Sequence, residues 1–265
     1  MMILRAVLLA LLGAAAALPS WAAESVLTLT PRPGATLRVL VDRPAAPIGS
    51  VVLMAGGDGV LDLDAQGRIG SNMRQNFVVR TRAAYVAAGY AVFVPDIASD
   101  QRGTRGYRFT ADYANDVAAV VAEARKLALP VAIVGTSRGA IPVVAVFAKQ
   151  SAVRPDAAVI SSGVLIANEG GGSASSLGGL DRINVPVLLL RHRADSCRVS
   201  APGDADRFKA LLTGASRVDI VTLDGGGPSS AQADACGASH YHGFYGIDDQ
   251  AVAATVQWLR ANMRR

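Results

Sequence analysis

Short runs of branched apolar residues recur along the chain, and stretches with helical spacing of apolar and polar positions separate most of them. Eight runs predict β-strands, at 26–31, 37–42, 50–55, 91–95, 131–135, 157–161, 186–191 and 217–222. Helical spacing predicts helices at 74–88, 111–127, 138–149, 203–213 and 248–263. From Val51 onward strand and helix alternate, which is typical of a mostly parallel sheet with helices on both faces.

The first two predicted strands have no helix between them. Pro31, Pro33 and Gly34 supply turn residues there, so we expect an antiparallel hairpin at one edge of the sheet. No internal repeat and no second-domain boundary interrupts the pattern. One low-complexity patch, EGGGSASSLGG at 169–179, predicts a mobile loop that serves either as a solvated linker or as a wall over a pocket.

The N-terminus has the pattern of a secretory signal peptide. Arg5 precedes an apolar run at 6–18, and Ser20 and Ala22 fit the small residues that signal peptidase requires. The apolar run is shorter than the roughly 20 residues of a spanning helix, so we expect cleavage after Ala22 rather than an uncleaved membrane anchor. The sequence therefore predicts a signal peptide at 1–22, a single domain at 23–265, a periplasmic or secreted location and no stable membrane insertion after cleavage.

Composition narrows the classes of partner. The chain has 265 residues and a net charge of +5, without a Lys/Arg cluster interleaved with aromatics, so no nucleic-acid surface is predicted. It contains two cysteines, Cys197 and Cys236. In an oxidising compartment these favour one disulfide over two free thiols. The sequence predicts nothing about the oligomeric state.

The clearest chemical motif is GTSRG at 135–139. It directly follows the buried strand 131–134 and directly precedes a helix that begins at Ala140. A serine in so sharp a strand-to-helix turn has its Oγ lifted above the sheet, and the two glycines leave room where a Cβ would crowd the turn. This context favours Ser137 as a nucleophile over an ordinary glycine-rich turn. The backbone N–H of Arg138 then lies where an oxyanion forms.

A serine nucleophile needs a general base, and the base needs an orienting acid. With this type of turn the chain order is nucleophile, acid, base. His192 lies too early, but His240 and His242 both follow the last strand, and the residues alone leave both open. A metal site that combines these two with His192 or Asp195 is the alternative reading.

Asp195 is the predicted acid, because it follows the strand 186–191 at the expected place in the chain. Asp224 and Asp96 are its competitors, but Asp96 precedes Ser137 and breaks the order. Cys197 lies two residues after Asp195, and Cys236 lies shortly before the candidate bases. A disulfide between them would staple the acid loop to the base loop.

The second oxyanion donor is expected in the glycine-rich loop after the strand 50–55, which reads AGGDG. Gly57 is the first candidate and Asp58 the second, because glycines let the backbone approach a substrate carbonyl. A phosphate-binding loop is the rival reading, but no Gly-Lys-Ser/Thr follows.

Together these segments resemble the α/β-hydrolase superfamily, most of all small bacterial members with signal peptides that carry GGDG-type, GTSRG, D-x-C and HGF segments in this order. The resemblance covers nearly all of the mature chain. It implies an α/β-hydrolase fold of about eight strands, a Ser137–Asp195–His242 triad with His242 rather than His240 as base, and no cofactor or metal. The histidine that often opens the oxyanion motif is replaced here by Ala55, which leaves the second donor open.

Two connections bear on the substrate. Only about 20 residues separate the strands at 157–161 and 186–191, which leaves no room for a large cap domain. The segment 61–77 predicts a small flap carrying Arg68, Asn72 or Arg74, although solvated polar residues are the more typical reading. Arg68, Arg138 and Arg193 are candidates for contact with an anionic substrate, although a surface or ion-pair role is the more typical reading for each.

The predicted function is an exported serine hydrolase that cleaves an ester, thioester or amide of a small, accessible acyl substrate through an acyl-enzyme. The alternatives are a catalytically silent binding protein with the same fold, and a peptidase or acyltransferase that uses the same triad.

Overall fold

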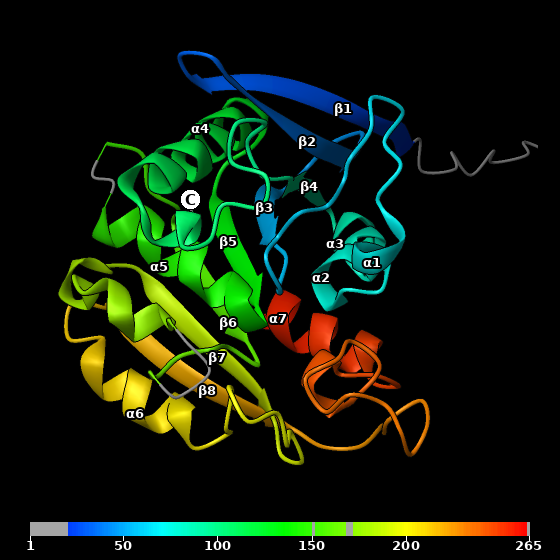
Figure 1. The fold of residues 1–265 in the computed structure, drawn as a ribbon, viewed down its shortest axis with the longest axis vertical. Coiled ribbons are helices and arrows are strands. Elements are labelled where there is room, and N and C mark those ends of the chain that lie inside the picture. The colour runs from blue at the N-terminus through cyan, green and yellow to red at the C-terminus, as the bar shows by residue number, and fades with distance from the viewer. Residues whose placement is uncertain (1–20, 150–151, 168–171, 264–265) are drawn as a thin grey trace, which may run out of the picture.

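The computed structural model describes residues 21–149, 152–167 and 172–263, which are built around an eight-stranded sheet (Figure 1). Its strand order is β1-β2-β4-β3-β5-β6-β7-β8. The β1–β2 and β2–β4 pairs are antiparallel and all other pairs are parallel. The strands are β1 (Trp21–Arg32), β2 (Ala35–Pro44), β3 (Gly49–Met54), β4 (Tyr90–Pro95), β5 (Val131–Thr136), β6 (Ala157–Ser161), β7 (Pro186–His192) and β8 (Arg217–Leu223). The predicted mostly parallel sheet and its edge hairpin are confirmed.

Helices cover both faces of the sheet, as predicted (Figure 1). One face carries α4 (Ala111–Leu127), α5 (Ala140–Ala148) and α6 (Asp204–Leu211). The other carries α1 (Ser71–Arg74), α2 (Phe77–Arg80), α3 (Arg82–Ala87) and α7 (Asp248–Asn262). Each face has its own apolar core, and α5 is buried along its whole length because apolar residues surround its axis. The 3-10 helices are η1 (Tyr107–Phe109), η2 (Ser137–Gly139), η3 (Ala174–Leu177), η4 (Leu180–Arg182) and η5 (Tyr241–Gly243).

The strand order changes direction at β3, and this change positions the site. From β3 the chain crosses first to β4 on one side and then to β5 on the other. Met54 at the end of β3 lies opposite Gly135 in β5. The loops that follow these two strands therefore meet at the carboxyl edge of the sheet, which is where open α/β sheets bind ligands.

The expected continuous helix at 74–88 is wrong, because the structure divides this stretch into α1, α2 and α3. Asn76 is extended, with ψ of 137°, and Thr81 also leaves helical geometry. The breaks allow contacts that a straight helix would not make. Phe77 packs on Phe244 with ring centroids 5.0 Å apart, and Arg80 donates to the carbonyl oxygen of Gly243 at 2.6 Å. Tertiary contacts here override the helical pattern.

Part of the glycine- and serine-rich patch is ordered, which contradicts the expectation of a mobile loop for that part. Ser173 forms a capping box with Ser176 at the start of η3, and Ala174 and Leu177 are buried. Residues 168–171 lie outside the described part of the chain. The connection from β6 to β7 contains only η3 and η4 among its described residues, so it holds no large cap.

The segment predicted as a flap, 61–77, is packed down at its start. Leu61 and Leu63 are buried, and their backbone N–H groups donate to the carboxylate of Asp96 at 2.7 and 3.0 Å. Arg68 pairs with Asp64 at 2.6 Å rather than lying over a pocket. Leu61, Leu63 and Ile69 therefore belong to the core of the fold, whereas Ala65, Gln66 and Arg68 are exposed.

The predicted signal peptide falls mostly on residues 1–20, which lie outside the described residues. Trp21 and Ala22 belong to β1, where they lie opposite Pro44 and Arg43. Cleavage after Ala22 would therefore shorten β1 by two residues and leave the rest of its pairing intact. None of the helices in the described part of the chain is both long and apolar enough to span a bilayer.

Candidate active site

Ser137 directly follows β5 and adopts a left-handed backbone conformation, with φ of +54°. Such a conformation is strained for a residue with a side chain. The turn is tight on both sides of it. A Cβ on Gly135 would lie 2.2 Å from the carbonyl oxygen of Gly139, and a Cβ on Gly139 would lie 2.2 Å from that of Met54. Only glycine fits at these two positions, so the turn has the geometry that the GTSRG motif predicts.

Asp195 and His242 come together at the same end of the sheet. Asp195 lies just after β7 and His242 lies in η5, and both side chains are buried. Nδ1 of His242 is 3.0 Å from Oδ2 of Asp195. The other carboxylate oxygen accepts the backbone N–H of Cys197 at 2.9 Å, which fixes the plane of the carboxylate. This pair has the geometry of an acid that orients an imidazole.

The second nitrogen of that imidazole, Nε2, takes no part in the contact with Asp195. Nε2 of His242 is buried and has no hydrogen-bond partner among the residues that the structure describes. His242 and Ser137 both line a small pocket of about 60 Å³, together with Gly56, Gly57 and Asn76. The structure therefore brings Ser137, Asp195 and His242 to one place. Asn76 was not predicted, whereas the predicted Asn72 and Arg74 are exposed and do not line this pocket.

The competing residues have other partners. Nε2 of His192 is 2.8 Å from the carbonyl oxygen of Gly225, and its ring stacks on Tyr241. The ring of His240 packs edge-on against Tyr241 at 5.1 Å. Asp224 pairs with Arg193. Within the described ranges, no group of three or more His, Cys, Asp or Glu residues is arranged to hold a metal ion.

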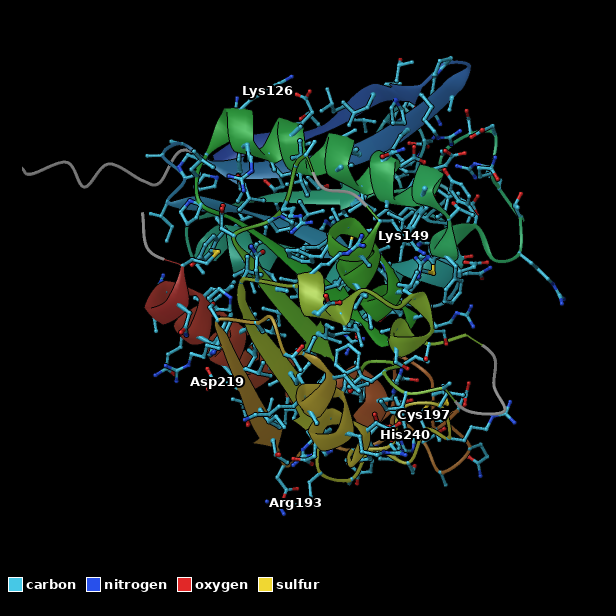
Figure 2. The ribbon with its side chains drawn as sticks, turned by 90° about the vertical axis from the view of Figure 1, so that its left-hand side faces the viewer. Lys126, Lys149, Arg193, Cys197, Asp219 and His240 are labelled. Atoms are coloured by element: carbon cyan, nitrogen blue, oxygen red, sulfur yellow. A yellow bond between two sulfur atoms is a disulfide. The ribbon has the colours of Figure 1, made fainter. Side chains whose placement is uncertain are left out.

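The predicted disulfide is present. Cys197 and Cys236 are bonded, with their Cα atoms 4.5 Å apart and a sequence separation of 39. Cys197 lies two residues after Asp195, and Cys236 lines the pocket that contains Ser137 and His242. In the view of Figure 2, Cys197 and His240 both lie at the end of the molecule opposite Lys126. The bond therefore ties the loop of Asp195 to the loop of His242, as expected.

Peptide geometry orients one candidate oxyanion donor, the backbone N–H of Arg138. The carbonyl oxygen of Ser137 accepts the N–H of Val164 at 3.1 Å. Because C=O and N–H of a trans peptide point in opposite directions, the N–H of Arg138 is directed away from Val164. On the facing loop Gly57 has a positive φ of +58° and lines the pocket of Ser137, whereas Asp58 lines a neighbouring pocket.

Arg108 connects the two loops that carry the candidate donors. Its side chain is 6 % exposed, and its guanidinium donates to the carbonyl oxygens of Ala55 (2.9 Å), Gly57 (3.2 Å) and Arg138 (3.1 Å). A Cβ on Gly59 would lie 1.7 Å from Nη2 of Arg108, so glycine there makes room for the guanidinium. Sequence reasoning missed Arg108, because its contacts depend on how three distant loops meet.

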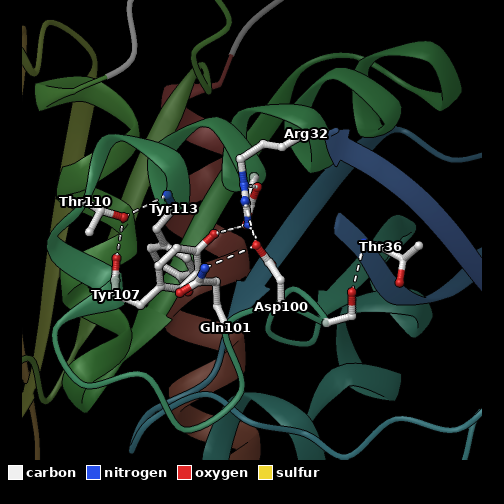
Figure 3. A network of polar contacts seen from close by, with 9 residues as sticks. Arg32, Thr36, Asp100, Gln101, Tyr107, Thr110 and Tyr113 are labelled. Carbon is white, nitrogen blue, oxygen red and sulfur yellow. Dashed lines mark hydrogen bonds and ion pairs between the residues drawn. The ribbon is translucent and has the colours of Figure 1, made fainter. Parts of the chain in front are cut away.

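A polar network anchors the segment that carries Arg108 (Figure 3). Arg32 in β1 donates to both carboxylate oxygens of Asp100, to Asp116 and to the hydroxyl of Tyr107. The hydroxyl of Tyr107 in turn donates to Asp116. Burial and this bond raise the pKa of Tyr107, and the hydrogen bond from Arg32 lowers the pKa of Asp100 to about 2. The network fixes the residue directly before Arg108.

Ser200 is a further neighbour of the Asp–His pair. Its Oγ lies 3.1 Å from Oδ2 of Asp195 and 2.9 Å from Nδ1 of His242, and the residue is buried. The hydroxyl therefore contacts both partners of the same hydrogen bond. The sequence contains no signal for this contact, because Ser200 lies in a loop between β7 and α6 whose course is set by tertiary packing.

Solved structures provide the comparison. No protein-family model matches the sequence, and no match among curated protein sequences is significant. The structure is similar to a dienelactone hydrolase from Anabaena variabilis, with a TM-score of 0.62 and 18% identity over 91% of this chain and 99% of that one. It is also similar to a Pyrococcus furiosus esterase, with a TM-score of 0.65 and 12% identity over 91% and 92% of the two chains.

A third similar structure belongs to a longer chain. The acylaminoacyl peptidase of Pyrococcus horikoshii matches with a TM-score of 0.62 and 13% identity, over 94% of this chain and 43% of that one. At these identities the comparison establishes the architecture, and the eight-stranded sheet without a large cap agrees with it. The chain has the α/β-hydrolase fold.

Proposed function

We propose that this protein is a serine hydrolase that cleaves an ester, thioester or amide of a small acyl substrate. The observation that carries the proposal is the position of His242. Its Nδ1 contacts Asp195, its Nε2 has no hydrogen-bond partner in the described part of the chain, and the residue lines the same pocket as Ser137. A hydrolase, an esterase and a peptidase among the structural neighbours support the same class of activity.

In this mechanism Oγ of Ser137 attacks the carbonyl carbon of the substrate while Nε2 of His242 takes the hydroxyl proton. The C=O electrons move to oxygen, and the tetrahedral oxyanion is held by the backbone N–H groups of Arg138 and Gly57. When the intermediate collapses, the leaving alkoxide, thiolate or amine takes the proton from Nε2. Water, deprotonated by Nε2, then attacks the acyl-enzyme, and Nε2 returns that proton to Oγ of Ser137 as the bond to the acyl carbon breaks and the acid is released.

Buried groups around Asp195 support its role as the orienting acid. Its carboxylate accepts the N–H of Cys197 and contacts Ser200, so it is held in one plane beside the imidazole. An ionised Asp195 stabilises the imidazolium that forms when His242 takes the serine proton. Ser200 then acts as a positioning residue for this pair.

Arg108 supports the oxyanion site as a positioning residue. It holds the carbonyl oxygens on both sides of Gly56 and the carbonyl of Arg138, so both donor loops are fixed before substrate arrives. Fixed donors require no reorganisation when charge develops, which is the main source of their catalytic effect.

Export to an oxidising compartment is part of the same proposal. The disulfide between Cys197 and Cys236 supports it, because such bonds persist in the periplasm and outside the cell. The signal-peptide pattern at 1–22 supports the same location.

Hydrolysis of p-nitrophenyl acetate tests the proposal. We expect turnover by the wild-type protein, and a fall of about a thousandfold or more in kcat for Ser137→Ala. Ser25→Ala, at an exposed position in β1, is the matched control and keeps full activity. Ligand-dependent thermal stabilisation without turnover of ester, thioester or peptide substrates would instead identify a catalytically silent binding protein with this fold.

A further inference from the structure

A second, larger pocket adjoins the candidate oxyanion site. It has a volume of about 480 Å³, in the range of small-molecule sites, whereas the pocket at Ser137 holds about 60 Å³. Two of its lining residues, Asp58 and Arg138, directly follow Gly57 and Ser137 in the chain. A substrate whose carbonyl lies at Ser137 therefore has space to extend into this larger pocket.

The lining of the larger pocket is strongly positive. Arg105, Arg108 and Arg138 line it, and Asp58 is the one acidic residue among the lining residues. The carboxylate of Asp58 accepts the backbone N–H of Val60 at 3.1 Å. Within residues 21–149, 152–167 and 172–263, no carboxylate oxygen lies within 4.0 Å of any of these three guanidinium groups.

The three arginines differ in their hydrogen-bond partners. Arg108 is committed to backbone carbonyls, whereas the guanidinium groups of Arg105 and Arg138 have no hydrogen-bond partner in the described part of the chain. Arg105 is exposed on the loop before η1, and Arg138 is half-buried beside Ser137. The network of Figure 3 anchors the loop of Arg105 through Asp100 and Tyr107, so this wall of the pocket is held in place.

Arg102, which lines a different pocket, has carboxylate partners. A neighbouring pocket contains Arg38 and Arg102, but Asp62, Asp64 and Asp96 line the same pocket. Arg102 pairs with Asp62 at 2.6 Å and with Asp96 at 2.7 Å. Two carboxylates thus neutralise Arg102, whereas neither Arg105 nor Arg138 has a carboxylate partner in the described part of the chain. A half-buried cation such as Arg138 is stabilised by an anion.

We propose that this pocket binds a carboxylate of the substrate through Arg105 and Arg138, so that the enzyme prefers acyl substrates that carry a negative charge. The inference rests on the proposed serine hydrolase function and names its substrate class. Arginine suits this task because its planar guanidinium binds a carboxylate through two parallel hydrogen bonds. The carboxylate belongs either to the acyl part or to the alcohol part of the substrate, and the two sources are separated by the choice of substrates.

Two matched substrate pairs test the proposal. The first compares p-nitrophenyl hydrogen glutarate with p-nitrophenyl valerate, which have the same chain length and leaving group and differ in the charge of the acyl part. The second compares the acetyl esters of 4-hydroxybenzoate and of its methyl ester, with each rate divided by the rate of hydrolysis by hydroxide. We expect the charged member of one pair to have a kcat/KM about tenfold higher, and the preference to shrink as ionic strength rises.

Variants of Arg105 test the contact itself, since this exposed side chain is not needed for folding. Arg105→Gln lowers the preference for the charged substrate about threefold or more, and Arg105→Glu reverses it. Arg68→Gln is the matched control, because Arg68 is an exposed arginine that pairs with Asp64. We expect this variant to leave the preference for the charged substrate unchanged. Equal kcat/KM values within both pairs, or a preference that survives Arg105→Glu, would overturn the proposal.

The experiments distinguish a failure of the proposed hydrolase function from a failure of the proposed carboxylate site. If no ester is hydrolysed, the proposed hydrolase function fails, and calorimetric titration of the wild-type protein with glutarate then tests the pocket alone. Binding that Arg105→Glu abolishes upholds the carboxylate site. Absence of glutarate binding, or binding that Arg105→Glu leaves unchanged, overturns it.

Discussion

Replacement of Arg108 by methionine tests how the two oxyanion loops are held. Methionine is long and apolar, so it fills much of the same space but makes none of the three hydrogen bonds to the carbonyls of Ala55, Gly57 and Arg138. The loops then lose the common partner that holds them together. Arg108→Lys keeps the charge but cannot reach three carbonyls at once, so it should give an intermediate result.

The size of the effect follows from these contacts. Each hydrogen bond contributes about 1 kcal/mol net, but removal of the buried guanidinium also relieves a desolvation cost, so we expect a loss of about 2 kcal/mol in the free energy of unfolding. Complete removal of one oxyanion donor costs about 10²–10³-fold in kcat. Loosened donors should cost less, about 10- to 100-fold, which corresponds to about 1.4–2.7 kcal/mol in the activation free energy.

Steady-state hydrolysis of p-nitrophenyl acetate, with urea denaturation alongside, separates the two effects. We expect kcat of Arg108→Met to fall while KM changes less than about threefold, because the donors act on the transition state. The matched control is Arg125→Met, since Arg125 also binds a backbone carbonyl and a carboxylate but lies in the last turn of α4. That variant should lose stability and keep its kcat. A folded Arg108→Met protein with kcat within twofold of wild type would refute the reasoning.

Three further perturbations have defined outcomes. Ser200→Ala should lower kcat about three- to tenfold with little change in KM, because the hydroxyl contacts both Asp195 and His242; an unchanged kcat would show that it does not position the pair. Reduction of the Cys197–Cys236 bond should lower the free energy of unfolding by about 4 kcal/mol for a separation of 39 residues, measured with urea; a change below about 1 kcal/mol would contradict this. The hydrogen bond from Arg32 lowers the pKa of Asp100 to about 2 from its ordinary value of 3.8, so the Arg32–Asp100 contact contributes fully to stability above pH about 4 and is lost as the pH falls to about 2. Asp100→Asn should remove this part of the acid dependence of unfolding, and an acid limb unaltered in the variant would contradict the assignment.

Much of the fold was predictable because alternating apolar runs and helical stretches carry it. All eight strands lie where branched apolar residues predict them, since buried parallel strands need continuous apolar sequence. The stretch 74–88 misled this reasoning. Its helical spacing is real, but packing of Phe77 on Phe244 and the contacts of Arg80 divide it into three short helices.

The candidate nucleophile was predictable because its turn has a recognisable local sequence. Gly135 and Gly139 allow the sharp turn of Ser137, and both are visible in the sequence. Asp195 could be placed by its order relative to the strands, and the same order left His240 and His242 as candidate bases. The family resemblance favoured His242, and its contact with Asp195 supports that choice.

Arg108 and Ser200 were not predictable, because their roles consist entirely of long-range contacts. Arg108 is 51 and 53 positions from the carbonyls of Gly57 and Ala55 that it binds. Ser200 is 42 positions from His242. No sequence pattern around Arg108 or Ser200 indicates the residues that they contact. Three arginines were candidates for contact with an anionic substrate. In the structure Arg68 and Arg193 are ion-paired, whereas Arg138 has no carboxylate partner among the described residues.

Covalent labelling at Ser137 tests the central claim most directly. The wild-type protein is incubated with a fluorophosphonate probe, digested, and mapped by mass spectrometry, with Ser137→Ala as the comparison. We expect one labelled site, on the peptide that contains Ser137, and no labelling of the variant. A wild-type protein that stays unlabelled, or a Ser137→Ala variant that labels as fast as wild type, would contradict the account.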